Sequence, residues 1–482
     1  MLAGVRILRK AVPVTRFDVA VLGAGPAGVM AAARASALGA RTVLLASDDF
    51  GGMAANDGPV PVRTLAQAAR LLRDAGQLPR YGVAKIEPQL DYGKVLSRVD
   101  TVIGDVRASS FLLPALREAG VELLENVGRT RFLDGGRVQT DSGLTVAADT
   151  FIVCTGGISK TLPIPGFEFT STHSDAWDLT AVPTSMIVVG AGATGLQVAS
   201  VFHAFGTRVH LLEVGPRLLP TADADVATAL ADRFDAMGID VRVAFGSVES
   251  FERTESGVAI HMISGAGRSA LEADLVVVAV GWTTDISALH LDSAGVETTE
   301  RGFIGVDEYQ RTSNPNVFAA GDVTGRVMLA SEAIRDGYIA ATNAVRGPSV
   351  VNAPHPVPSG SFTDPEYASV GLTEEEARRD REIHCTVLDY RDCTRPIIDG
   401  QTFGFCKMVV DVATSELLGC HIVGDRAVDI VQVVTVAMAA GMCRVDAIAR
   451  LPVSFPTYAE IVVQTAALAA RRLGLDAGWQ VG

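Results

Sequence analysis

Two glycine-rich segments carry the clearest chemical signal in this sequence. "GAGPAG" (Gly23–Gly28) follows the apolar run "FDVAVL", and "GAGATG" (Gly190–Gly195) follows "SMIVV". In each segment the first glycine allows a tight turn, the second lets the backbone approach a pyrophosphate, and the third lets a helix pack closely on a strand. A helical pattern follows each segment, so the phosphates are expected at a helix N-terminus. The sequence therefore predicts two dinucleotide-binding loops.

An acidic residue distinguishes the second loop from the first. Glu213 lies 18 residues beyond the second loop, at the end of the next strand, where a carboxylate accepts hydrogen bonds from ribose hydroxyls. A 2′-phosphate would be repelled there, and the following "VGPRLLP" offers only Arg217 as a cation, which favours NADH over NADPH. The same spacing from the first loop leads to Ala46. Asp48 or Asp49 could replace that missing acid, or both could be solvated loop residues.

Two further strands end abruptly at glycine. "FIVCTGG" runs into Gly156, and "NPNVFAAGDV" runs into Asp322. Ligands of open α/β sheets bind at the carboxyl ends of the strands, so both segments are expected beside a cofactor.

The elements that must position these residues change in character along the chain. Up to about Gly347, short β-branched runs alternate with alanine-rich helical patterns, which is typical of parallel α/β sheets. After that point a proline-rich stretch leads to a capping box at Thr373 and Glu376. "FGFCKMVVDVATSELLGCHIVG" predicts two antiparallel strands, and two helices follow. We therefore expect an α/β protein with two Rossmann-like domains and a C-terminal α+β domain.

Composition limits the classes of partner. The net charge of the 482 residues is -14, which disfavours nucleic acid and anionic membranes as main partners. The longest apolar stretch, Asp429–Cys443, is too short and too interrupted to span a bilayer. No secretory signal is recognisable, so a cytoplasmic location is expected. The six cysteines show no C-x-x-C or zinc-like spacing, so we expect buried reduced thiols and no metal site.

The order of these motifs resembles that of the pyridine nucleotide-disulfide oxidoreductases, the family of dihydrolipoamide dehydrogenase, glutathione reductase and mercuric reductase. The resemblance extends from Phe17 to about Leu473 and rests on the segments GAGPAG, Gly51-Gly52, CTGG, GAGATG, AAGD, DPEYASVGLTEEEA and FPTYAE. It implies a homodimer with an N-terminal extension (1–16), an FAD domain (17–157 and 286–350), an NAD(P) domain (158–285) and an interface domain (351–482).

The resemblance also implies which residues bind the cofactors. Those expected to bind FAD are Gly23, Gly25, Gly28, Gly51, Gly52, Gly156 and Asp322. Those expected to bind NAD are Gly190, Gly192, Gly195 and Glu213.

The chain departs from the family pattern in the residues that carry thiol chemistry. The loop "FGGMAANDGPVPVRTL" has Ala54 and Pro59 at the two cysteine positions, so it can form no disulfide. The acid/base histidine is replaced by Phe455, although its orienting acid remains as Glu460.

A lysine–glutamate pair that the family places beside the flavin is replaced as well. Arg63 and Gln197 stand at the two positions. Arginine is never deprotonated in practice, so Arg63 is expected to stabilise negative charge on a reduced flavin without donating a proton. Gln197 could instead only cap a helix turn.

These departures lead to a functional hypothesis. We expect an enzyme that passes electrons from NADH through FAD directly to a small acceptor, such as a quinone, without disulfide chemistry. The acceptor would lie in an apolar pocket to which Phe455 and Glu460 contribute. The alternatives are a regulatory subunit that binds flavin and NAD with reduced activity, and an FAD-dependent nicotinamide transhydrogenase.

Overall fold

A computed structural model describes residues 15–109 and 112–479, and they form two compact units. The first unit contains the described residues of Met1–Pro61, Asp100–Ile158 and Trp282–Ala353. The second unit contains those of Val62–Val99, Ser159–Gly281 and Pro354–Gly482. Most of the expected N-terminal extension, residues 1–14, lies outside the described residues, whereas Thr15 and Arg16 begin the first strand.

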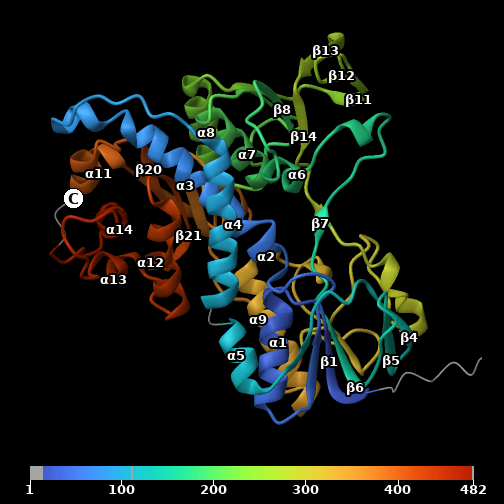
Figure 1. The fold of residues 1–482 in the computed structure, drawn as a ribbon. Helices are drawn as coiled ribbons and strands as arrows, with labels where there is room; N and C mark the ends of the chain where they lie inside the picture. The colour runs from blue at the N-terminus through green and yellow to red at the C-terminus, as the bar shows by residue number, and fades with distance from the viewer. Residues whose placement is uncertain (1–14, 110–111, 480–482) are drawn as a thin grey trace, which may run out of the picture. The chain divides into compact units, whose positions relative to one another are not determined.

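A mixed sheet forms the centre of the first unit (Figure 1). Its strands are β1 (Thr15–Leu22), β2 (Thr42–Leu45), β3 (Glu122–Leu124), β4 (Thr130–Asp134), β5 (Arg137–Thr140), β6 (Thr145–Val153) and β16 (Val317–Ala319). β6 pairs in parallel with β1 on one edge. On its other edge β6 pairs first with antiparallel β5 and then with parallel β16. The carboxyl ends of β1, β2, β6 and β16 therefore lie at one edge of the sheet.

Helices cover one face of this sheet. The helices are α1 (Pro26–Ala37), α2 (Gly52–Asn56), α5 (Leu112–Ala119) and α9 (Ala330–Arg346), together with the end of α4 (Tyr92–Ser109). Val19 and Val21 of β1 pack with α1 and α9, whereas the alternate residues Ala20 and Leu22 pack in the core on the opposite face. α1 approaches α9 closely because Gly337 has no side chain: a Cβ there would lie 2.2 Å from the carbonyl oxygen of Ala27.

The N-terminal part of the second unit repeats this architecture on a smaller scale. Four parallel strands lie in the order β10 (Asp240–Val243), β9 (Arg208–Glu213), β8 (Ser185–Val189) and β14 (Leu275–Val278). All five residues of β8 are buried, as its apolar sequence predicts for a central parallel strand. The other elements are α6 (His173–Trp177), α7 (Ala193–Ala204), α8 (Ala224–Met237) and an antiparallel sheet of β11 (Ser247–Arg253), β12 (Val258–Ser264) and β13 (Gly267–Ala273).

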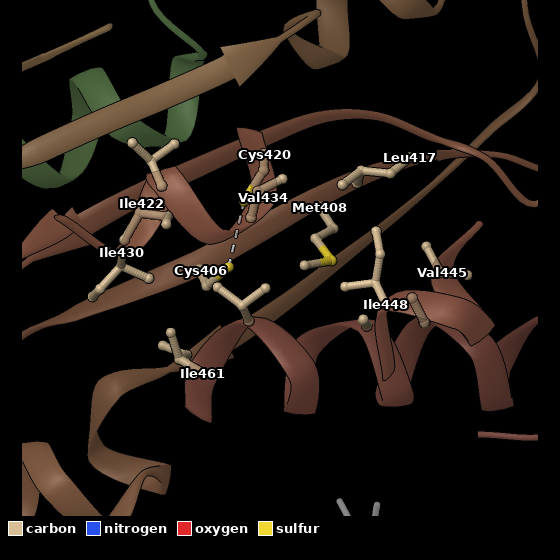
Figure 2. Packing of buried hydrophobic residues seen from close by; sticks show 14 of the residues in the cluster. Cys406, Met408, Leu417, Cys420, Ile422, Ile430, Val434, Val445, Ile448 and Ile461 are labelled. Atoms are coloured by element: carbon tan, nitrogen blue, oxygen red, sulfur yellow. Dashed lines mark hydrogen bonds between the residues drawn. The ribbon is translucent and has the colours of Figure 1, made fainter. Parts of the chain in front are cut away.

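The C-terminal part of the second unit contains an antiparallel sheet packed against helices (Figure 2). Its strands are β17 (Ser359–Ser361), β18 (Tyr367–Gly371), β21 (Leu417–Gly424), β20 (Gly404–Asp411) and β19 (Ile383–Asp389), in that order across the sheet. The helices are α10 (Glu374–Ala377), α11 (Thr394–Asp399), α12 (Ala427–Ala439), α13 (Val445–Ala449) and α14 (Glu460–Arg472). α3 (Pro59–Ala75) also belongs to this unit from Val62 onwards.

These observations confirm the predicted fold class of two Rossmann-like regions and a C-terminal α+β region. The predicted capping box is also present: Thr373 accepts a hydrogen bond from the backbone amide of Glu376, and the Glu376 carboxylate accepts one from Thr373. All six cysteines are free thiols. Within the described part of the chain, no helix combines the length and the hydropathy needed to cross a membrane.

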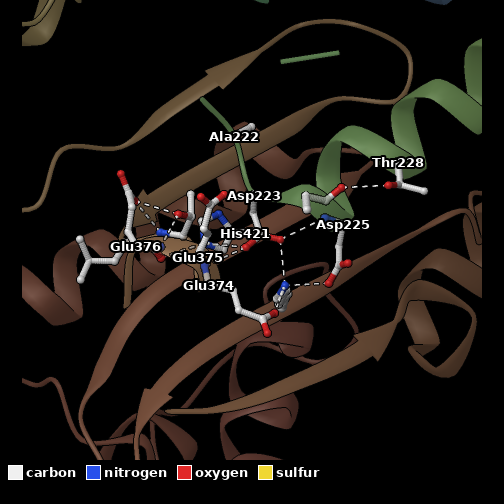
Figure 3. Close-up of polar contacts among 12 residues, drawn as sticks. Ala222, Asp223, Asp225, Thr228, Glu374, Glu375, Glu376 and His421 are labelled. Atoms are coloured by element: carbon white, nitrogen blue, oxygen red, sulfur yellow. Dashed lines mark hydrogen bonds and ion pairs between the residues drawn. The ribbon is translucent and has the colours of Figure 1, made fainter. Parts of the chain in front are cut away.

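A buried ionic cluster connects α8 to the C-terminal sheet within the second unit (Figure 3). The Lys407 ammonium, on β20, contacts Asp223 at 2.8 Å, Asp225 at 2.7 Å and Glu374 at 2.6 Å. Asp223 is the N-cap of α8, so the cluster fixes the point at which this helix begins.

Candidate functional site: two glycine loops and their carboxylates

Two close approaches of the backbone shape the first glycine loop. Gly23 has φ +104°, and a Cβ there would lie 2.3 Å from the carbonyl oxygen of Cys154. A Cβ on Gly28 would lie 1.8 Å from the carbonyl oxygen of Gly23, so α1 can sit on the turn only without a side chain. Around Gly25 only the backbone of Gly52 comes near, at 3.9 Å from the position of a Cβ. The roles expected of the three glycines match this geometry.

The second segment predicted for the same cofactor lies against this loop. The Gly51 amide donates a hydrogen bond to the carbonyl oxygen of Ala24 at 3.0 Å. A Cβ on Gly52 would lie 2.7 Å from Cα of Gly25, so Gly52 can lie against this backbone only without a side chain. The structure therefore brings Gly51 and Gly52 to the first glycine loop.

Asp322 supplies the carboxylate at this sheet edge. It follows β16 directly, and a Cβ on Gly157, next to Gly156, would lie 3.4 Å from the Asp322 Cβ. Among the described residues no group hydrogen-bonds to the Asp322 carboxylate, and burial raises its pKa to about 6, with a further contribution from the Asp336 charge. A half-buried carboxylate without a partner is suited to accept hydrogen bonds from ligand hydroxyls.

A network that the sequence did not reveal holds the Asp322 turn. The Asp336 carboxylate accepts hydrogen bonds from the Gln310 amide at 2.7 Å, the Asn352 amide at 2.8 Å and the backbone amide of Gly321 at 3.4 Å. Asp336 is 4% exposed. No sequence motif marks these contacts, since their partners are 15 to 26 residues away along the chain. The one signal in the sequence was an aspartate at an apolar-face position of a helix, where a charged residue is rarely buried without partners.

These features fit a bound FAD. The closely packed glycines leave backbone space at the N-terminus of α1, which favours a pyrophosphate, and no side chain of the described residues caps that terminus. Asp322 would accept hydrogen bonds from hydroxyl groups of the flavin's sugar chain. Bound FAD would supply two-electron transfer between a nicotinamide and a second substrate.

The first loop lacks the acidic residue that the second loop has at the end of the following strand. Ala46 is buried at the end of β2, and the two candidate substitutes lie beyond it. Asp48 accepts a hydrogen bond from the Ser47 hydroxyl at 3.0 Å. Asp49 forms an ion pair with Arg107 at 3.0 Å, and the same Arg107 donates a hydrogen bond to the Asn56 side chain at 2.8 Å. Asp49 therefore helps to hold the Gly51–Gly52 loop, a role that the sequence did not suggest.

The second glycine loop repeats the geometry of the first. A Cβ on Gly195 would lie 1.9 Å from the carbonyl oxygen of Gly190, and nothing lies within 4 Å of the Cβ position on Gly192. The Glu213 carboxylate, 7% exposed, accepts hydrogen bonds from the Ala191 amide at 2.8 Å and the Gly215 amide at 2.7 Å. The predicted acid thus lies at its loop, where it fits the ribose of a nicotinamide dinucleotide.

Arg63 and Gln197 have different contacts within the second unit. The Arg63 guanidinium stacks on the Phe362 ring, 3.7 Å from its centroid. The carbonyl oxygen of Ala193 accepts hydrogen bonds from the Gln197 amide at 3.1 Å and the Ser361 hydroxyl at 3.5 Å. Gln197 thus bonds one turn back along α7, as the alternative interpretation allowed. A role of either residue at the flavin stays a prediction.

The two residues of the "FPTYAE" motif have different environments. The Phe455 side chain is 72% exposed, so it does not fill the core of its own chain. Glu460 begins α14 and is 8% exposed. One of its oxygens accepts a hydrogen bond from the Gln464 amide at 2.6 Å, whereas Oε2 has no partner among the described residues. Burial raises the pKa of this carboxyl group. The roles of Phe455 and Glu460 in an acceptor pocket stay predictions.

Comparison with known families places these features in context. The model of the pyridine nucleotide-disulphide oxidoreductases matches residues 17–337, and that of the dimerisation domain of the same family matches residues 357–466. The second match supports the expected homodimer.

Individual relatives cover almost the whole chain. Dihydrolipoyl dehydrogenase 2 of Haloarcula marismortui is 33% identical over 468 residues, which cover 94% of this chain and 97% of the relative. Dihydrolipoyl dehydrogenase of Thermus scotoductus is 32% identical over 435 residues, with 88% and 91% covered. The HOCl-induced flavoprotein disulfide reductase RclA from Escherichia coli, at 24% identity, has the same fold, with a TM-score of 0.83 over 94% of this chain and 99% of that one.

The relatives contradict one prediction. The expected transfer of electrons to an acceptor such as a quinone, and the statement that the chain is not a disulfide reductase, are wrong, because the relatives are named dihydrolipoyl dehydrogenases and mercuric reductases, which point to disulfide chemistry. The prediction relied on Ala54 and Pro59. These two residues exclude a disulfide within their own loop, but they place no limit on a disulfide in the substrate.

Proposed function

Because the chain belongs to the pyridine nucleotide-disulfide oxidoreductase family, we propose that it transfers electrons from NADH through FAD to a small disulfide substrate. The reaction is NADH + H⁺ + RSSR → NAD⁺ + 2 RSH. The S–S bond breaks, the dihydronicotinamide loses two electrons and a proton, and both sulfur atoms leave as thiols. The family establishes an NAD(P)H-dependent flavoprotein oxidoreductase, and the proposal adds the substrate and the preference for NADH.

The observation that carries the proposal is the pair of matched glycine loops. In both loops the third glycine lies so close to the first that a Cβ would come within 2 Å of its carbonyl oxygen. Each loop begins a 12-residue helix whose N-terminus no side chain of the described residues caps. A chain that keeps both sites can bind a flavin and a nicotinamide dinucleotide.

The substrate class follows from the relatives and from the loop. The dihydrolipoyl dehydrogenases among them are named for a dithiol, whose oxidised form is a disulfide. Ala54 on α2 and Pro59 at the start of α3 provide no sulfur atoms. In this proposal both sulfur atoms that change oxidation state therefore belong to the substrate. The substrate disulfide reacts directly with the reduced flavin, and no disulfide of the protein relays the electrons.

The preference for NADH is supported by the surroundings of Glu213. Its carboxylate is held at the second loop by two backbone amides. Arg217, the cation nearest in sequence, donates hydrogen bonds to the carbonyl oxygens of Pro220 and Ala222 at 3.2 and 3.3 Å. Because these hydrogen bonds hold Arg217, a 2′-phosphate would be repelled by the Glu213 carboxylate without a compensating attraction to Arg217.

The test uses the full-length protein loaded with FAD, under anaerobic conditions. NADH is expected to bleach the flavin absorption, and lipoamide, glutathione disulfide or an aromatic disulfide is expected to restore it with two thiols released per NADH. Reduction by NADH without reoxidation by any of the three disulfides would show that the substrate class is wrong. A protein that takes up no FAD would refute the whole proposal.

A second experiment tests the cofactor preference. Glu213→Gln is expected to raise the ratio of kcat/KM for NADPH to that for NADH by about tenfold, because the repulsion of the 2′-phosphate is removed. Glu252→Gln, an exposed change on β11, is the matched control and should leave the ratio unchanged. An unchanged ratio in Glu213→Gln would show that this carboxylate does not select the cofactor.

A further inference from the structure

A cavity of about 710 Å³ in the second unit lies outside the glycine loops. Its lining includes the five arginines Arg63, Arg70, Arg73, Arg80 and Arg233. Its volume is within the range of small-molecule pockets. A concentration of guanidinium groups is unusual for a chain whose net charge is -14.

One face of α3 supplies most of these groups. Arg63, Arg70 and Arg73 project from α3 at spacings of seven and three residues, which place them on one side of a helix. Arg80 follows in the short helix Leu78–Tyr81. The lining also includes Gly400, whose φ of +67° favours glycine; a Cβ there would lie 3.2 Å from an Arg80 nitrogen.

Two of the five arginines are neutralised within the protein. Arg70 forms an ion pair with Asp425 at 2.7 Å, and a longer one with Asp74 at 3.5 Å. Arg73 forms an ion pair with Asp364 at 2.7 Å through Nε. Three of the four carboxylates in the lining are used in this way.

The other three arginines have no carboxylate partner within ion-pair distance among the described residues. Arg63 stacks on Phe362, and Arg233 lies over Phe403, 5.4 Å from the ring centroid. Stacking on a ring face leaves the N–H groups at the edge of the guanidinium free to donate hydrogen bonds. The remaining lining carboxylate, Glu366, has a pKa of about 7 because it is buried and lies near other acids, so it neutralises the arginines only in part.

An unsatisfied hydrogen-bond donor lies in the same wall. Nη1 of Arg73 is buried, and no group in the described part of the chain accepts a hydrogen bond from it. A buried donor without a partner costs about 1–3 kcal/mol, so native proteins usually satisfy it with a ligand or water. Arg73 lines the cavity, so an oxyanion bound there could accept this hydrogen bond.

We propose that this cavity binds a small organic polyanion through phosphate or carboxylate groups. Guanidinium groups bind both kinds of oxyanion by paired N–H···O hydrogen bonds. The rings of Phe362 and Phe403 would contact an apolar part of the same molecule. The lining contains no residue of either glycine loop, and the proposal does not depend on the disulfide substrate.

The test measures binding to the FAD-loaded protein by calorimetry at constant ionic strength. The probes are pyrophosphate and citrate, with potassium chloride as the reference, and saturating NAD⁺ is present to occupy the second glycine loop. Saturable binding of at least one probe is expected, and which probe binds more tightly distinguishes phosphate from carboxylate ligands. No saturable binding of either probe would overturn the proposal.

Variants identify the binding place. Arg80→Gln and Arg233→Gln are each expected to weaken binding about tenfold, because each removes a charged donor without breaking an internal ion pair. Arg98→Gln, an exposed arginine of the same unit outside the cavity, is the matched control and should bind as the wild type does. Equal affinity in all three variants would mean that the anion binds elsewhere, and it would overturn the assignment. Sedimentation of each variant shows whether a change of oligomeric state accounts for any loss of binding.

Discussion

The Nζ atom of Lys407 lies 2.8 Å from Oδ1 of Asp223, and both side chains are almost completely buried. Asp223 also accepts hydrogen bonds from the backbone amides of Asp225 and Glu374. His421, which pairs with Lys407 across the sheet, lies 3.9 Å from the same carboxylate and has a lowered pKa because it is buried. Lys407 therefore holds the start of α8 on the C-terminal sheet.

We expect Lys407→Met to lower the free energy of unfolding by about 3–5 kcal/mol, because it leaves the buried Asp223 carboxylate without its lysine counter-charge. Urea denaturation measures the effect. Lys94→Met removes an exposed lysine whose ion pair with Asp91 is 3.1 Å long, and it should cost less than about 1 kcal/mol. A loss in Lys407→Met as small as that of the control would show that the cluster does not stabilise the fold.

The two glycine loops allow a paired prediction. Gly28→Ala places a methyl group 1.8 Å from a carbonyl oxygen of the first loop, and Gly195→Ala does the same at 1.9 Å in the second. Each helix must move away from its turn. We expect Gly28→Ala to be purified without bound FAD, and Gly195→Ala to keep FAD but to lose reduction by NADH at least tenfold. Absorption spectra and anaerobic NADH titration measure both.

Gly104→Ala is the control for these substitutions. Gly104 lies in α4, and nothing lies within 4 Å of its Cβ position. The variant should keep both the flavin and its reduction. If Gly195→Ala lost FAD, or if Gly28→Ala kept it, the assignment of the two loops to two different cofactors would be wrong.

Local sequence was enough to predict the residues that the backbone itself positions. Gly23, Gly28 and Gly195 are recognisable because a turn followed by a closely packed helix requires glycine at fixed spacings. The position of Glu213 was also predictable, because one helix and one strand of ordinary length separate it from the second glycine loop. The fold class was predicted correctly for the same reason, since each supersecondary unit leaves its own pattern in the sequence.

Contacts between distant segments were not predictable in this way. The hydrogen bonds from Gln310 and Asn352 to Asp336, and the stacking of Arg63 on Phe362, connect residues that no motif links. The acceptor was predicted wrongly because Ala54 was interpreted as a change of reaction. A missing side chain shows only what the loop itself cannot do, and the substrate depends on groups outside it.

Flavin binding is expected to depend on the protonation of Asp322, whose pKa is raised from 3.8 to about 6. The ionised carboxylate is the better acceptor for ligand hydroxyls, so the affinity of the apoprotein for FAD should fall as the pH decreases through about 6. Fluorescence titration of FAD across this range measures it.

Asp322→Asn separates this effect from general acid sensitivity. The variant should bind FAD more weakly, with an affinity that no longer changes near this pH. Since the folded-state pKa is raised, the stability that Asp322 contributes is present below 3.8 and lost as the pH rises through about 6. Apoprotein of the variant should therefore be more stable than the wild type above that pH. An unchanged pH dependence of FAD binding would exclude Asp322 as the group responsible.

The last prediction concerns the carboxyl group of Glu366. Burial and neighbouring acids raise its pKa from 4.5 to about 7. The Val428 amide, which donates a hydrogen bond to it at 3.3 Å, opposes this rise only in part. A raised folded-state pKa means that its contribution to stability is present below 4.5 and is lost as the pH rises through about 7. Glu366→Gln should therefore be more stable than the wild type above this range, by on the order of 1–3 kcal/mol, and equally stable below it. Urea denaturation at several pH values measures the difference.

Glu375→Gln, an exposed change on α10, should show no such divergence. Parallel curves for Glu366→Gln and the wild type would mean that folding does not raise the pKa of Glu366. Glu366 would then be ionised at neutral pH, and it would neutralise the arginines of the cavity more fully than proposed.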